Sequence, residues 1–153
     1  MAHNLTALNL APLHLDDKKT EIAKTAIKIA EEEGVPAKYV IAIIYHESEF
    51  NQSMYSGNND GSVDVGLMQL NSNNREEFAK LFNDGVPYNP LLVEDNIRIG
   101  VRYLKDHFKT FHTWELAFRA YNVGYARAHR SKTGKRYAAH IWHTVKIING
   151  GKY

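Results

Sequence analysis

The feature that most constrains this chain is an apolar segment that ends beside acidic residues. Tyr39 to Tyr45 is the longest apolar run, and it is apolar all round a helix, which predicts a helix buried on every side. Pro36 suits the first turn of this helix, which we expect to run to about Ser48. Its last turn carries Glu47, so a carboxyl group is expected at the end of the most apolar helix. The run is far shorter than the ~20 residues that a membrane span needs.

The rest of the chain is predicted to be mostly helical, with one small β element. Apolar spacing and capping residues predict further helices between Asp16 and Gly34, over Arg75–Phe82, over Glu94–Phe111, between Thr113 and Gly124, and over Lys135–Asn149. Turn-forming residues at 56–62 separate two strand-like pieces, 54–55 and 63–65, which is typical of a hairpin. The predicted fold class is therefore α+β, predominantly helical. We expect a single domain of residues 1–153, in which residues 1–15 form an extended N-terminal segment.

Composition excludes several kinds of chemistry. The 153 residues include no cysteine, so disulfides, thiolate metal sites and cysteine nucleophiles are all excluded. His46 and Glu47 begin like a helical zinc motif, but Phe50 stands where the second histidine is needed. The loop from Ser56 resembles a calcium loop, but Leu67 stands at its final glutamate position. We therefore expect neither a metal nor a cofactor.

The charge of the chain is divided unevenly between its two parts. Residues 1–97 carry a net charge of −8 and residues 98–153 a net charge of +10. This asymmetry indicates a basic face for an anionic partner such as nucleic acid, anionic lipid or an acidic polymer. The alternative interpretation is that helices of opposite charge pack beside each other.

Four short motifs follow one another along the chain. They are Glu47-Ser48, the Gly-Leu-Met-Gln sequence at 66–69, the Asn-Ile-x-x-Gly sequence at 96–100 and the Ala-Tyr-Asn-Val-Gly sequence at 120–124. In this order, over roughly residues 23–145, they resemble the soluble lytic transglycosylase and goose-type lysozyme group. The resemblance implies a lysozyme-like fold and cleavage of the β-1,4 bond between N-acetylmuramic acid and N-acetylglucosamine in bacterial peptidoglycan.

The chemistry of that cleavage agrees with the setting of Glu47. Cleaving a glycoside requires an acid that protonates the leaving oxygen. A carboxyl group serves as that acid near neutral pH when apolar surroundings raise its pKa. Glu47, at the end of the apolar helix, is therefore the expected general acid and base. Glu49 lies about 200° further around the helix and is expected to be exposed.

The resemblance also implies roles for other residues. The hydroxyl of Tyr121 is expected to bond the catalytic carboxyl, the amides of Gln69 and Asn122 to bind N-acetyl groups, and Met68 to form an apolar wall for a sugar ring. The implied substrate-binding positions are Ser48, Ser56, Gly66, Met68, Gln69, Asn71 and Asn122. The alternative interpretation of Tyr121 and Met68 is ordinary packing in the core.

Two reaction types remain open. A lytic transglycosylase needs only one carboxyl group and forms 1,6-anhydromuramyl products. A hydrolytic muramidase usually needs a second carboxylate to position water, for which Asp60 and Asp64 are the candidates, although both suit turn formation. Asn71 stands where goose-type enzymes carry an aspartate, which favours the transglycosylase. A peptidoglycan-binding module without catalysis is a more remote alternative.

The expected partner is the peptidoglycan glycan strand, with the basic C-terminal third contacting anionic cell wall. The basic segment 127–136 has no nucleic-acid signature, so nucleic acid is not expected, and the protein is expected to be a monomer. The N-terminus lacks the basic region and apolar core of a secretory signal. This predicts phage-type release from the cytoplasm or a place in a virion; the alternative is a periplasmic enzyme whose leader has been removed.

Overall fold

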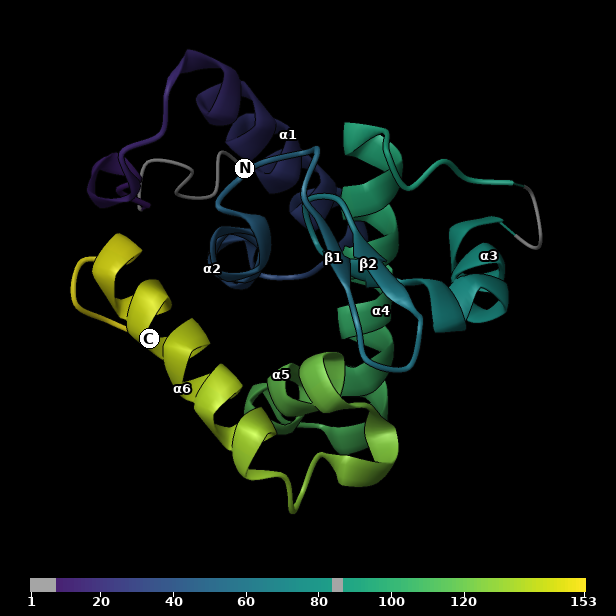
Figure 1. Ribbon diagram of the computed structural model, residues 1–153. Coiled ribbons are helices and arrows are strands. Elements are labelled where there is room, and N and C mark those ends of the chain that lie inside the picture. Colours follow the sequence, from purple (N-terminus) through teal and green to yellow (C-terminus); the bar gives the residue numbers. More distant parts are fainter. Residues whose placement is uncertain (1–7, 84–86) are drawn as a thin grey trace.

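The computed structural model describes residues 8–83 and 87–153 (Figure 1). The helices are α1 (Asp17–Glu33), α2 (Ala37–Ser48), α3 (Arg75–Asn83), α4 (Val93–Phe111), α5 (Trp114–Val123) and α6 (Lys132–Ile148). The strands are β1 (Tyr55–Gly57), β2 (Val63–Val65) and β3 (Leu70–Asn71), and the short 3-10 turns are η2 (Ala11–Leu13), η3 (Ser72–Asn74) and η4 (Tyr125–Arg127). The predicted class, α+β and predominantly helical, is confirmed.

Helix boundaries follow capping residues. The Asp16 carboxylate accepts a hydrogen bond from the Lys19 amide at 2.8 Å and begins α1, as expected. The last helix begins at Lys132 rather than at Lys135. The reason is Ser131, whose hydroxyl oxygen accepts a hydrogen bond from the Gly134 amide at 3.1 Å and caps the helix. The expected boundary was wrong because it followed the apolar spacing and left out this cap.

Helix α2 lies at the centre of the molecule, as its apolar sequence predicts. Figure 1 shows it nearly end-on between α1 and α6, and both of these helices contact it. Val40 to Ile44 are completely buried. Glu49 leaves the helix in the left-handed conformation, with φ of 50°, and is exposed, as expected. The packing around α2 therefore fixes the position at which Glu47 is presented.

The sheet is antiparallel, in the order β1-β2-β3. Asp64 on β2 pairs with Ser56 on β1 and with Asn71 on β3. Because residues directly opposite each other in a sheet share a face, these three side chains lie on one face. The strand β3 was not predicted, since two residues are too few for an alternating pattern.

The segment that joins β2 to β3 is anchored to α4 by a buried amide. The Asn96 side chain is 1% exposed; its oxygen accepts from the Met68 amide at 2.8 Å. Its nitrogen donates to the carbonyl oxygens of Val65, at 2.9 Å, and Pro90, at 2.8 Å. Gly66 lies so close that a Cβ there would stand 2.3 Å from the Asn96 nitrogen.

The start of the described chain differs from the expected extended segment. Residues 1–7 of that segment lie outside the described residues. The 3-10 turn η2 follows, and Leu13 within it is buried. The Asn9 amide donates to the Ile148 carbonyl oxygen at 2.8 Å, which ties this part to the end of α6. Within residues 8–83 and 87–153, no helix has the length and apolar character to cross a membrane.

We predict that Gly66→Ala destabilises the fold more than Gly61→Ala. Both glycines have positive φ, 77° and 85°, so each alanine costs about 1–2 kcal/mol in backbone conformation. Only at Gly66 does the new Cβ also meet Asn96 and the Pro90 carbonyl, which adds about 1–3 kcal/mol. Urea unfolding of the two variants measures the difference; equal losses would show that the close approach to Asn96 is unimportant.

Candidate active site

A cleft of about 670 Å³ lies beside the sheet and is bordered by the end of α5 and the turn η4. Of the sequence-predicted site residues, it is lined by Glu47, Asp60, Asp64, Gln69, Asn71, Tyr121 and Asn122. It is also lined by residues that the sequence analysis did not single out, among them Asn58, Ser62, Tyr103, Arg127 and Thr133. The cleft is therefore rich in amides and hydroxyls, and Glu47, Asp60 and Asp64 add carboxyl groups.

Glu47 occupies the end of α2 and is the carboxyl group of the cleft whose pKa is strongly raised. Its side chain keeps some contact with the open cleft, but protein atoms surround most of it. This desolvation, together with the smaller effect of the negative charge of Asp64, raises the pKa of Glu47 to about 8. A hydrogen bond from Tyr137 acts in the opposite direction, because it favours the ionised carboxylate. Glu47 is therefore protonated at neutral pH and able to donate a proton.

The tyrosine that contacts Glu47 is Tyr137, not Tyr121. The Tyr137 hydroxyl, on α6, donates to the Glu47 carboxylate at 3.0 Å, and the ring is 4% exposed. The Tyr121 hydroxyl instead donates to the Met68 carbonyl oxygen at 2.6 Å. The role expected for Tyr121 was therefore wrong, although Tyr121 lines the cleft beside Glu47. A buried tyrosine hydroxyl needs a partner, but the sequence alone did not reveal which one Tyr137 would find.

The two candidate second carboxylates differ in their surroundings. Asp64 lies at the middle of β2, where its oxygens accept from the side-chain amides of Asn71, at 2.8 Å, and Asn58, at 3.2 Å. Asp60 is exposed and accepts from the Ser62 hydroxyl at 2.6 Å, the Ser62 amide at 2.9 Å and the Asn73 side chain at 3.0 Å. These bonds, that of the Ser62 hydroxyl foremost, lower the pKa of Asp60. Asp60 therefore shapes the loop, while Asp64 is the carboxylate whose charge acts on Glu47.

Four of the expected substrate-binding residues do not line the cleft. Ser48 is buried, with its hydroxyl within hydrogen-bond distance of the Ile44 and Leu67 carbonyl oxygens, at 3.2 and 2.8 Å. Gly66 and Met68 are also buried, and a Cβ at Gly100 would stand 2.3 Å from the Met68 sulfur. Met68 is thus a packing residue and forms no wall for a sugar. Ser56 shares the sheet face of Asp64 but lies outside the cleft lining.

Gln69 and Asn122 are placed differently within the cleft. The Gln69 nitrogen donates to the Gly66 carbonyl oxygen at 2.9 Å and to that of Met54 at 3.3 Å. Its side-chain oxygen is the group left to face a ligand. Asn122 is exposed at the end of α5. The expectation that both amides lie along the groove agrees with this placement, and their contacts with N-acetyl groups remain a prediction.

A protonated carboxyl facing an open, amide-lined cleft, with a second carboxylate acting on it, is the arrangement of a glycoside-cleaving enzyme. The family model described as "Transglycosylase SLT domain" matches residues 24–145. The chain therefore belongs to the transglycosylase SLT domain family. This membership confirms the enzyme class expected from the motifs, a peptidoglycan lytic transglycosylase.

Curated proteins from Salmonella are similar to most of the chain. "Invasion protein IagB" of Salmonella typhimurium strain SL1344 is 33% identical over 120 residues, covering 76% of this chain and 72% of that protein. "Invasion protein IagB" of Salmonella typhi is 33% identical over 118 residues, covering 75% and 71%.

Solved structures share the fold. The lytic transglycosylase Slt of Pseudomonas aeruginosa, solved as an inactive mutant, superposes with a TM-score of 0.69 at 21% identity, over 85% of this chain. A 70-kDa soluble lytic transglycosylase, solved in complex with bulgecin A, superposes with a TM-score of 0.58 at 24% identity, over 80% of this chain. The chain spans 24% and 20% of the lengths of those two proteins.

We predict that Tyr137→Phe moves the alkaline limb of the pH–rate profile upward. The lost hydrogen bond favours ionised Glu47, so its removal raises the pKa of Glu47 above about 8 and keeps the acid protonated to higher pH. His46 packs edge-on against Tyr137. Burial, and then the charge of His140, lower the pKa of His46, so this histidine titrates at lower pH than the alkaline limb and does not contribute to it.

Tyr121→Phe is the control for this measurement. It removes the bond to the Met68 carbonyl and is expected to destabilise the fold by about 1–2 kcal/mol while leaving the alkaline limb in place. A shift of the limb in Tyr121→Phe, with none in Tyr137→Phe, would reverse the assignment of the two tyrosines.

Proposed function

We propose that Glu47 is the general acid and base that cleaves the β-1,4 bond between N-acetylmuramic acid and N-acetylglucosamine, leaving 1,6-anhydromuramyl ends on peptidoglycan. The observation that carries this proposal is the position of the Glu47 carboxyl. It is desolvated at the end of α2, bonded to Tyr137 and open to the cleft on one side. Among the described lining residues, the other carboxylates are Asp60, which is bound into its loop, and Asp64.

The proposed reaction returns Glu47 to its starting state. Glu47 donates its proton to the glycosidic oxygen while the bond from that oxygen to C1 of N-acetylmuramic acid breaks. The Glu47 carboxylate then takes the proton of the C6 hydroxyl of the same sugar. The oxygen of that hydroxyl bonds to C1 and closes the anhydro ring, so no water enters the products. The hydroxyl belongs to the same molecule, and well-oriented intramolecular groups reach effective concentrations of about 10⁵–10⁸ M.

Asp64 is proposed to stabilise the positive charge that develops at C1. Each of its oxygens accepts an amide hydrogen bond, from Asn71 and from Asn58, and these two bonds fix the orientation of the carboxylate. A fixed negative charge near the developing cation lowers the barrier without proton transfer. Asn71, at the position where goose-type enzymes carry an aspartate, supports ring closure over the alternative, a hydrolytic muramidase in which Asp60 or Asp64 positions water.

The biological setting is also a proposal. The matched relatives from Salmonella are named invasion proteins. For this chain those names support a bacterial enzyme that opens the wall locally, in preference to phage-type release.

We predict that Glu47→Gln lowers the rate of peptidoglycan cleavage by about 10²–10⁴-fold, because glutamine keeps the shape of the side chain but cannot transfer a proton. Glu49→Gln, an exposed neighbour, is the matched control and should stay within about twofold of wild type.

Mass spectrometry of digested sacculi should show ends that are lighter than reducing ends by one water. Predominantly reducing ends would reject ring closure and favour hydrolysis.

We predict that Asp64→Asn lowers the cleavage rate by roughly 10²-fold, because it removes the charge that faces C1. The alkaline limb should also move to lower pH, because the Asp64 charge contributes to the raised pKa of Glu47. Asp60→Asn, in the exposed loop, should leave both the rate and the limb nearly unchanged. The opposite pattern, with Asp60→Asn inactive and Asp64→Asn active, would assign the second carboxylate to Asp60.

A further inference from the structure

Arg127 gives the cleft a positive charge at one end. Among the lining residues that the structure describes, Glu47, Asp60 and Asp64 carry carboxyl groups, and Arg127 is the only lysine or arginine. Arg127 lies in η4, just after the end of α5, and is exposed. No ion pair in the described part of the chain includes it. The guanidinium is therefore available to a ligand that lies in the cleft.

The positive charge continues from Arg127 onto the first turns of α6. Thr133 lines the cleft, and Tyr137, four residues further on, contacts Glu47, so this face of α6 borders the cleft. Arg136 lies three residues from Thr133, and Lys132 lies one turn before Arg136, which places both beside that face. We call Arg127, Lys132 and Arg136 the basic rim.

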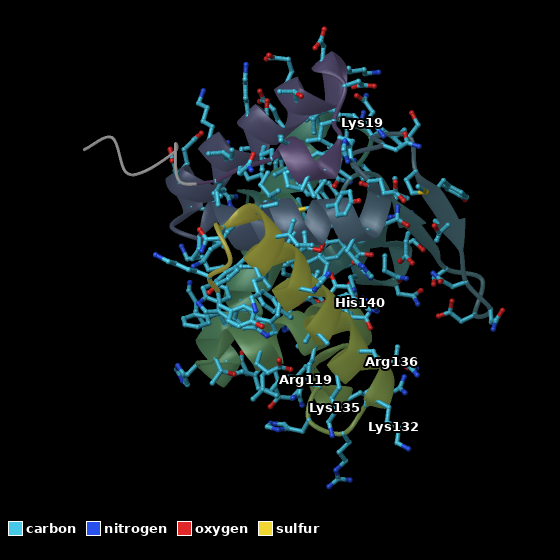
Figure 2. The ribbon with its side chains drawn as sticks, turned by 90° about the vertical axis from the view of Figure 1, so that its left-hand side faces the viewer. Lys19, Arg119, Lys132, Lys135, Arg136 and His140 are labelled. Atoms are coloured by element: carbon cyan, nitrogen blue, oxygen red, sulfur yellow. The ribbon has the colours of Figure 1, made fainter. Side chains whose placement is uncertain are left out.

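Figure 2 shows how the basic side chains of α6 are distributed. Lys132 and Arg136 project on one side of the helix, in line with His140 one turn further on, and Arg119 and Lys135 lie toward the other side. Arg119 is paired with Glu115, and both Arg119 and Lys135 line a separate hollow beside Trp142. The rim and this hollow are therefore different surfaces, and only the rim adjoins the cleft.

Nothing within α6 offsets the charge of the rim. The helix contains no aspartate or glutamate, and its first turn has no acidic residue. Cations at a helix N-terminus oppose the positive end of the helix dipole, where acidic residues are preferred. Neither Lys132 nor Arg136 forms an ion pair among the described residues. The partner that complements these charges is therefore expected to be an anion from outside the chain.

We propose that the basic rim binds the carboxylates of the stem peptides carried by the glycan strand, so that the enzyme prefers peptide-bearing strands. This inference rests on the proposed function, in which the sugars of that strand occupy the cleft. The N-acetyl and hydroxyl groups of the sugars are neutral, whereas the stem peptides on the lactyl groups carry several carboxylates. Arginine pairs well with carboxylates because its planar fork donates two parallel hydrogen bonds.

The test compares three substrates at low salt. They are native peptide-bearing strands, the same strands with their carboxylates converted to neutral amides, and strands stripped by an amidase, which keep only the lactyl carboxylate. The wild-type enzyme should cleave the native strands about fivefold faster than either of the other two, a preference that corresponds to exposed ion pairs. The preference should shrink as added salt screens the charges.

Two variants report on the rim itself. Arg127→Gln, and separately Lys132→Gln combined with Arg136→Gln, should each lose about twofold on native strands and keep the wild-type rate on amidated strands. Lys18→Gln combined with Lys28→Gln is the control, because both lysines are exposed on α1, which contributes no residue to the described cleft lining. This control should keep the full preference for native strands.

Other outcomes overturn the inference. Equal losses on all three substrates would give the rim a structural role, and an undiminished rate on stripped strands would assign the anion to the lactyl carboxylate. A wild-type enzyme that cleaves none of the strands contradicts the proposed function instead. In that case co-sedimentation with native and amidated strands still tests the rim, because its binding preference does not require cleavage.

Discussion

Two hydrogen bonds of the Asn96 carboxamide, with the Met68 amide and the Val65 carbonyl, hold the segment between β2 and β3 against α4, and a third binds the Pro90 carbonyl just before that helix. An amide buried this deeply would cost about 1–3 kcal/mol for each group left without a partner, so the segment and the helix are strongly favoured in one arrangement. The same segment carries the Met68 carbonyl, which accepts from Tyr121 on α5. Asn96 and Tyr121 thus join the sheet, α4 and α5. Residues of all three line the cleft.

The raised pKa of Glu47 is a consequence of the buried position of α2. A helix that is apolar on all faces is stable only in the interior. The Glu47 side chain at its last turn is therefore largely removed from water. Ionisation is then unfavourable, and the pKa rises to about 8. Tyr137 supplies one hydrogen bond to the carboxylate, which limits this rise and fixes its orientation. The packing that stabilises the core therefore also raises the pKa of Glu47.

The sequence was sufficient for the fold class, for the helices apart from the start of α6, and for the position of Glu47 at the end of a buried helix, because apolar periodicity and capping are local signals. It was insufficient for contacts between distant elements. Tyr137 lies 90 residues from Glu47, and only the packing of α6 on α2 brings the two together. The motif at 66–69 resembled a known site, but a motif does not distinguish a residue that contacts a ligand from one that packs. Met68 is of the second kind, since the absence of a side chain at Gly100 makes room for it.

The uneven charge of the chain had two explanations: packing of oppositely charged helices is observed for α4, and an anionic partner remains our proposal for α6. On α4, Arg98 and Arg102 form ion pairs with Glu33 at the end of α1, at 3.0 and 2.8 Å, and Arg102 is the main cause of the lowered pKa of Glu33. These cations neutralise acids of the first part of the chain, as expected for oppositely charged helices that pack together. On α6, no acid of the described residues takes that place for Lys132 and Arg136. Part of the positive charge that stays unpaired in the described residues thus forms the basic rim beside the cleft, where an anionic substrate would encounter it.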